Sequence, residues 1–198
     1  MNLESLIQSV GLLGLLAIVF AENGLFFGFF LPGDTLLFTA GFLAARGHFN
    51  IWTLTISLIV ASILGVFVGF WFGKKYGVRL FTRPDSRFFR RENIDKAHRF
   101  YQKYGSFTIV LARFVPIVRT FAPIVAGIAD MSYQRFVAYN ILGGIIWAGG
   151  ITLMGYWFGD TIPNIDKYIL PVMGVIVVAS FAPGLFHLRK KGRNSPAS

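Results

Sequence analysis

The sequence predicts an all-α polytopic membrane protein, with an inverted-topology repeat made of two re-entrant broken-helix hairpins plus transmembrane helices. The first reason is composition, because 55% of the 198 residues are hydrophobic and 17% are aromatic. The mean hydropathy of +0.61 is far above that of a soluble domain. The second reason is a set of long stretches without charge, and the third is an internal repeat with an offset of 86 residues.

Uncharged apolar stretches define the expected spans. About 20 apolar residues are needed to cross a hydrocarbon core of about 30 Å. Three stretches meet this length and a fourth, at the N-terminus, is shorter: Gly47–Gly73, Phe136–Gly159, Tyr168–Leu188 and Ser5–Ala21. The sequence leaves open whether the N-terminal stretch is a span or the first arm of a hairpin.

The net charge of +10 is concentrated in two segments. Residues 74–103 hold ten basic and three acidic side chains, and the tail at 189–198 is also basic. By the positive-inside rule we expect both segments in the cytoplasm. Residues 136–159 must then run outward and the final helix, 168–188, inward. Residues 104–135 must enter and leave on the cytoplasmic side, as a re-entrant hairpin does.

The basic segment, 74–106, is expected to be an amphipathic cytoplasmic helix. Aromatic and aliphatic side chains recur at helical spacing between residues 85 and 104, with basic side chains between them. Because spans flank this segment, the nearest polyanion is the anionic membrane leaflet. We therefore expect no nucleic-acid partner.

Two halves of the chain share landmarks. The run Gly69-Phe-Trp-Phe-Gly73 recurs as Gly155-Tyr-Trp-Phe-Gly159, and the same offset places Gly41 on Gly127. The first repeat would cover 10–73 with a hairpin at about 22–45, and the second 107–159 with a hairpin at about 107–129, within a single membrane domain, 1–198. Inverted repeats with interrupted helices are typical of secondary transporters, whose sites lie near the midplane. Such a repeat can be complete within one chain, so a homodimer is compatible with the sequence but not required.

Four ionisable residues lie inside these apolar regions: Glu22, Asp34, Arg113 and Arg119. Charged groups within spans are rare and mark substrate or proton pathways. If the hairpins meet, two acids would face two arginines. Guanidinium groups suit a phosphate, and burial disfavours the charged form of a carboxylate, so a buried acid can take up and release protons. The alternative is that the acids and arginines only lock the hairpins together.

Other residues receive simpler interpretations. Five are expected to form the hairpin turns: Pro32, Gly33, Pro116, Pro123 and Gly127. The four tryptophans are interpreted as packing or membrane-belt residues. Three scattered histidines and the absence of cysteine indicate no metal site, and we expect no cofactor and no enzymatic activity.

Three motifs resemble the DedA family, also called SNARE-associated or VTT-domain membrane proteins. They are Glu22-Asn-Gly24, Phe30-Leu-Pro-Gly-Asp34 and the run from Arg113 to Gly127, which contains Arg119. The resemblance covers roughly positions 10 to 185. It implies facing re-entrant hairpins, a bacterial inner-membrane location, and functional roles for Glu22, Asp34, Arg113 and Arg119.

The resemblance also implies a function. Bacterial members are associated with recycling undecaprenyl phosphate and with envelope maintenance that depends on the proton motive force; eukaryotic relatives are phospholipid scramblases. We therefore expect a proton-coupled transporter of a polyprenyl phosphate or phospholipid. Three alternatives remain: a carrier of a small anion, a membrane scaffold without transport, and a lipid phosphatase, against which the absence of a Pro-Ser-Gly-His run argues.

Overall fold

A computed structural model describes residues 3–24, 33–81, 105, 107–129 and 131–161. Within these residues the regular structure is entirely helical, as the sequence predicts. Several expected features lie outside the described residues. They are Pro32, residues 82–104 of the expected amphipathic segment, the expected final helix at 168–188 and the basic tail. The helices are α1 (Leu3–Gly24), α2 (Gly33–Ala45), α3 (Ile51–Phe81), α5 (Thr108–Ala112), α6 (Pro116–Ile128), α7 (Tyr133–Gly144), the π-helical η2 (Ile145–Gly149) and α8 (Gly150–Thr161).

Two helical rods are long and apolar enough to cross a membrane, by length and composition. One is Ile51–Tyr76 within α3, and the other is Tyr133–Thr161, in which α7, η2 and α8 follow one another without a break. Helix α3 begins four residues after the start of the uncharged stretch because Gly47 has a φ of 82° and Asn50 caps the helix. The Oδ1 of Asn50 accepts hydrogen bonds from the backbone N–H groups of Trp52 and Thr53, each at 3.1 Å.

The N-terminal apolar stretch is divided. Gly11 has a φ of 65° and breaks α1, which leaves an apolar helix over Gly11–Gly24. Fourteen helical residues extend about 21 Å, which is shorter than the hydrocarbon core. Helix α2, with 13 residues, is equally short. Neither helix alone is long enough to cross a bilayer.

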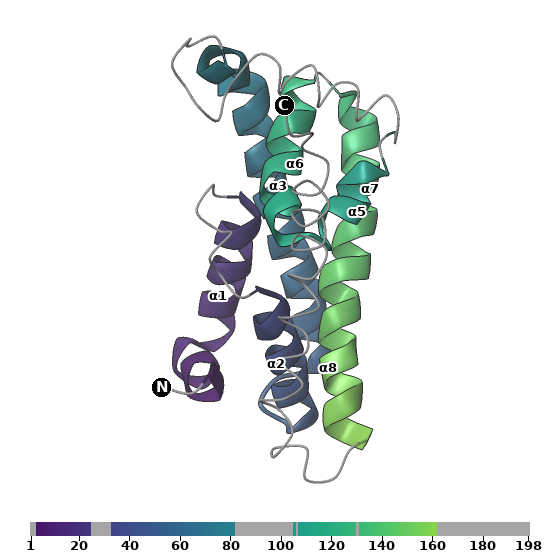
Figure 1. Ribbon diagram of the computed structural model, residues 1–198. Helices are drawn as coiled ribbons and strands as arrows, with labels where there is room; N and C mark the ends of the chain where they lie inside the picture. The colour runs from purple at the N-terminus through teal and green to yellow at the C-terminus, as the bar shows by residue number, and fades with distance from the viewer. Residues whose placement is uncertain (1–2, 25–32, 82–104, 106, 130, 162–198) are drawn as a thin grey trace, which may run out of the picture.

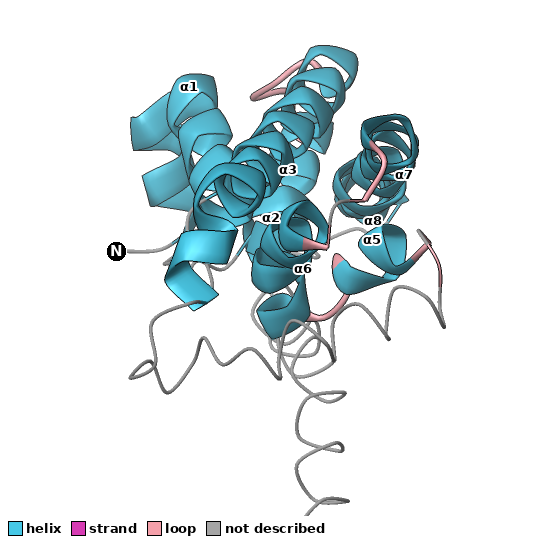
Figure 2. Cartoon of the chain, turned by 90° about the horizontal axis from the view of Figure 1, so that it is seen from above, coloured by secondary structure: helices cyan, strands magenta, loops and turns pink. Residues whose placement is uncertain are grey.

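Helices α2 and α6 each pack against the long rod of the other half of the chain, whereas α1 packs mainly on α3 of its own half. Helix α2 packs mainly on α8, and α6 packs mainly on α3. Figure 1 shows α3 ascending and the α7–α8 rod descending, with α2 beside the lower part of α8 and α6 beside the upper part of α3. Seen from above, α3 lies between α1 and the α7–α8 rod (Figure 2).

Glycines allow these helices to approach closely. A Cβ at Gly155 would collide with the backbone carbonyl of Phe38 on α2, and a Cβ at Gly73 would collide with that of Ile124 on α6. Gly41 and Gly127 face the opposite rods in the same way. Backbone-to-backbone contact of this kind is common between membrane helices, where dispersion contacts stabilise association.

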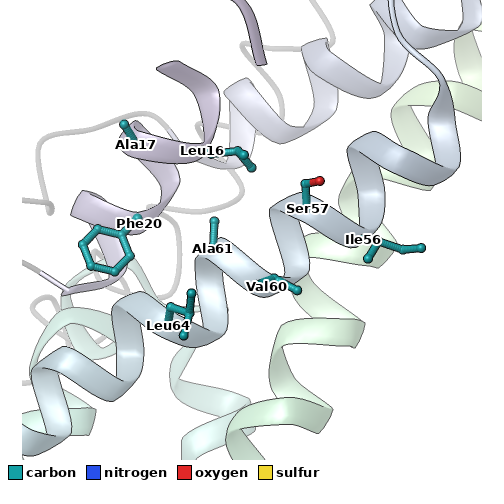
Figure 3. Close-up of a pocket in the computed structure, with 8 residues that line it drawn as sticks. All are labelled: Leu16, Ala17, Phe20, Ile56, Ser57, Val60, Ala61 and Leu64. Carbon is teal, nitrogen blue, oxygen red and sulfur yellow. The ribbon is translucent and has the colours of Figure 1, made fainter. Parts of the chain in front are cut away.

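An apolar stripe on α3 points away from the protein. Trp52, Ile56, Val60 and Leu64 recur every fourth residue and are between 49% and 66% exposed. The last three also line a groove of about 450 Å³ between α1 and α3, with Leu16, Ala17, Phe20, Ser57 and Ala61 (Figure 3). A continuous exposed apolar surface indicates contact with lipid or another apolar partner.

Candidate functional site

The centre of the site is a buried ion-pair cluster around Arg119. Its Nη1 donates a hydrogen bond to Asp34 Oδ1 at 2.9 Å, and its Nη2 is paired with Glu22 Oε1. The Arg119 side chain is 3% exposed, that of Glu22 is fully buried, and that of Asp34 is 16% exposed. One guanidinium group therefore joins two acids that precede it in the chain by 97 and 85 residues.

Helix ends bring these three side chains together. Glu22 lies in the last turn of α1, Asp34 in the first turn of α2, and Arg119 in the first turn of α6. The backbone N–H of Gly33 donates to Glu22 Oε1 at 3.2 Å. The partial positive charge at the N-terminus of α2 favours both acids. A side chain at position 33 would collide with the Glu22 carboxylate, so this position requires glycine.

Four of the five expected turn residues are among the described residues, and they are placed differently from one another. Gly33 and Pro116 begin α2 and α6, and Val115 before Pro116 has extended backbone. Pro123 and Gly127 lie inside α6 rather than at a turn. Gly127 contacts α3 there. Pro123 has no N–H to donate, so the carbonyl of Arg119 loses its usual helical partner.

Trp147, which lies in η2, contacts the ion-pair cluster. Its Nε1–H donates to Asp34 Oδ1 at 2.9 Å, and its ring lies 5.2 Å from the guanidinium carbon of Arg119 and 6.0 Å from that of Arg113. Trp147 is buried, whereas Trp52, Trp71 and Trp157 are exposed. Of the two interpretations given for the tryptophans, packing and membrane belt, Trp147 therefore fits packing, since it is buried within the site. It lies in a π-helical turn, a feature frequent at functional sites.

Arg113 has neutral partners. Its Nη2 donates to Asn140 Oδ1 at 2.6 Å and to the Asn140 carbonyl at 3.3 Å, and its Nη1 donates to Ser62 Oγ. No carboxylate among the described residues pairs with it. The expectation of two acids facing two arginines is corrected on this point: both acids pair with Arg119. Arg113 ends α5 and meets α3 and α7, which bring only uncharged side chains to it.

Sequence reasoning missed Asn140, Ser62 and the contacts of Trp147. Asn140 could have been found, because a carboxamide within the uncharged stretch from Phe136 to Gly159 must find a partner in the interior. Ser62 carried no such signal, since serine is common at membrane-helix contacts. The orientation of Trp147 depends on the π-helical turn, which the apolar pattern does not reveal.

The site has hydrogen-bonding atoms that lack partners in the structure. They are Glu22 Oε2, Arg113 Nε and Arg119 Nε. Chemically, the two guanidinium groups can bind an anion and the Glu22 carboxylate can bind a proton. The described residues contain no group of three side chains suited to a metal ion, and His48 is exposed in the turn before α3.

The chain is similar to known membrane proteins over most of its length. The chain matches the VTT domain over residues 31–157, which include Asp34, Arg113, Arg119 and Trp147. It is 46% identical over 182 residues to "Protein DedA" of Escherichia coli (strain K12), covering 90% of this chain and 82% of the relative. No solved structure matches the chain.

Two further relatives are named as membrane proteins. The uncharacterized membrane protein ML0287 of Mycobacterium leprae (strain TN) is 40% identical over 184 residues, covering 91% of this chain and 82% of that protein. Inner membrane protein YqjA of Escherichia coli (strain K12) is 33% identical over 186 residues, which cover 89% of this chain and 83% of that protein. Because the VTT domain matches most of the chain and the alignments to these relatives cover about nine tenths of it, the chain belongs to the DedA family of VTT-domain membrane proteins.

Proposed function

We propose that this protein translocates a lipid phosphate across the bacterial inner membrane, with undecaprenyl phosphate as the substrate, and couples this movement to protons. The observation that carries the proposal is the buried cluster of Glu22, Asp34 and Arg119 beside Arg113. A cluster of this charge within a membrane protein is costly, and such groups are retained chiefly for function. The family resemblance supports the choice of lipid.

In this proposal the phosphate headgroup is bound by Arg113 and Arg119. Guanidinium groups bind phosphate oxygens through paired hydrogen bonds, which lysine could not match in geometry. The hydrocarbon tail remains in lipid, along apolar surfaces such as the stripe on α3. This division explains how a chain with few buried polar groups can transport a long lipid.

Protons act through Glu22 and Asp34. While both carboxylates are ionised, they occupy the Nη1 and Nη2 groups of Arg119. Protonation of either acid weakens its pairing and releases an N–H group to the phosphate. Proton uptake and phosphate binding are then favoured together, which is the linkage that coupled transport requires.

The architecture proposed with this function is an inverted repeat of two re-entrant hairpins. Reciprocal packing supports it, since α2 contacts α8 while α6 contacts α3. The short lengths of α2 and α6, and the meeting of their N-termini at Arg119, support hairpins that enter from opposite sides. By the positive-inside rule, the two basic segments, 74–103 and 189–198, both lie on the cytoplasmic side in this arrangement.

The test is transfer of undecaprenyl phosphate across proteoliposomes that contain this protein, with and without a pH gradient. Wild type is compared with Glu22→Gln and with the double variant Glu22→Gln/Arg119→Gln, which keeps the net charge of the cluster. Gly150→Ala is the matched control, because a Cβ at position 150 meets no atom within 4 Å. We expect gradient-sensitive transfer in wild type and in the control, and its loss in both site variants.

The other outcomes separate the alternatives. Transfer that persists in both site variants would contradict the proposed roles of Glu22 and Arg119. If folded wild type transfers no lipid above empty liposomes but releases an inorganic anion, the small-anion carrier is supported instead. If neither moves, a scaffold role is supported.

A further inference from the structure

The two arginines of the site differ in how their charge is balanced. Arg119 is paired with two carboxylates, whereas Arg113 is bound by a carboxamide and a hydroxyl. Resting on the proposed function, we infer that Asn140 is a specificity-determining residue: it holds Arg113 as an uncompensated cation, and so makes Arg113 the arginine that first receives the phosphate.

Burial increases the effect of this difference in charge balance between Arg113 and Arg119. Arg113 is 2% exposed, and Asn140 and Ser62 are fully buried. Interactions between charges strengthen in a medium of low dielectric, so an uncompensated buried cation attracts an anion more strongly than an exposed one. At Arg119 two nearby carboxylates oppose the approach of the same anion. A phosphate entering the site therefore gains most at Arg113.

Asn140 is fixed in the orientation that this role needs. Its Nδ2 donates to the carbonyl of Ile63 on α3 at 3.2 Å, so Oδ1 is directed to Arg113 Nη2 at 2.6 Å. The amide thus accepts from the cation without offsetting its charge. An aspartate at this position would supply a second oxygen and a negative charge at the same distance, forming a buried ion pair.

The Nε of Arg113 retains capacity for a ligand. It has no hydrogen-bond partner and is buried. It lies close to the backbone of Gly143, where a Cβ would be 2.9 Å from both Nε and Cδ. The Arg113 side chain therefore packs closely against position 143, which only glycine allows.

A purely structural role for Asn140 is distinguishable. As a brace between α7 and α3, Asn140 would matter for its hydrogen bond to Ile63 and not for its lack of charge. Asn140→Ser and Asn140→Asp both remove that donor, but only the aspartate adds a charge. Their difference in anion binding isolates electrostatics from bracing.

The experiment measures binding of dodecyl phosphate to the detergent-solubilised full chain, through the rise in unfolding temperature that a ligand of the native state produces. Dodecanol is the uncharged control ligand. We expect wild type to be stabilised by dodecyl phosphate only, and Asn140→Ser to retain that affinity within about threefold. We expect Asn140→Asp to bind at least about tenfold more weakly, the equivalent of about 1.4 kcal/mol.

Ser62→Asp provides a second test from α3. It places a carboxylate beside Arg113 Nη1 and should weaken binding as Asn140→Asp does, so the inference is still tested if one of the two aspartate variants fails to fold. If the folded aspartate variants bind as tightly as wild type, or if Asn140→Ser loses binding equally, the inference is overturned. If wild type itself does not bind dodecyl phosphate, the proposed function fails, which is a different result.

Discussion

The indole Nε1–H of Trp147 donates to Asp34 Oδ1 at 2.9 Å, the same oxygen that accepts from Arg119 Nη1. Trp147 belongs to the second half of the chain and Asp34 to the first. The tryptophan thus shares an acceptor oxygen with Arg119 and also places its ring 5.2 Å from the guanidinium carbon of that residue. Both contacts depend on the position of η2.

Replacement of Trp147 by phenylalanine should separate these contacts. The ring remains, but the donor to Asp34 is lost, and a hydrogen bond to a charged group contributes about 1.5–3 kcal/mol. We expect the free energy of unfolding to fall by about that amount, measured by denaturant titration in detergent. Trp157→Phe is the control, because that side chain is 59% exposed and should change stability by less than about 0.5 kcal/mol. Equal effects of the two variants would contradict the assignment.

Alanine at Gly33 should disrupt the site although it adds only one methyl group. The Cβ would occupy the position of the Glu22 carboxylate, which must move away from the Gly33 N–H and from Arg119. We expect Gly33→Ala to lower the unfolding temperature and to abolish lipid transfer. Gly150→Ala, in helix α8 with open space, should be neutral or slightly stabilising, by about 0.5–1 kcal/mol. An unaffected Gly33→Ala protein would show that the carboxylate is not held there.

Loss of Arg119 should be partly repaired by loss of Glu22. Arg119→Gln leaves two buried carboxylates without their cation, and breaking a buried pair in this way costs about 3–5 kcal/mol. In Arg119→Gln/Glu22→Gln one of the carboxylates is removed as well. We expect the double variant to be more stable than Arg119→Gln alone, as determined by a double-mutant cycle. Simple additivity of the two single variants would argue against direct coupling.

Membrane orientation can be tested directly, because the sequence contains no cysteine. Single cysteines at His48 and Asp160 should react with a membrane-impermeant thiol reagent from outside intact cells. Cysteines at Lys75 and Ser132 should react only after the membrane is opened. All four positions are exposed, and Figure 1 shows the two pairs of helix ends at opposite ends of the fold. The reverse labelling pattern would invert the proposed topology.

The sequence was sufficient to predict the two long rods, because runs without charge and longer than 20 residues leave few alternatives. It also identified the four ionisable residues, since each is out of place in an apolar region. It could not predict that both acids would pair with Arg119. Arg113 and Arg119 are six residues apart, and their partners depend on which helix end each one faces. That depends on the turn at Val115 and Pro116 and on the helix packing.

Contacts of Asn140 and Trp147 were beyond sequence reasoning for a related reason. The sequence shows that the carboxamide of Asn140 needs a polar partner, but it does not show which one. The partner is Arg113 at the end of α5, whereas Asn140 lies on α7. The π-helical turn at Ile145–Gly149 changes the direction of every side chain that follows it. A regular 3.6-residue periodicity therefore misplaces Trp147.

The long sequence separation of the ion pairs has a consequence for biogenesis. Glu22 and Asp34 are synthesised 97 and 85 residues before Arg119. At about 5–20 residues per second, roughly 4–20 s pass between the entry of the acids and the arrival of their cation. During that interval the first half of the protein also lacks α6 and α8, the helices that cover α3 and α2. The first half can therefore reach its final packing and form its ion pairs only after α6 and α8 have been made.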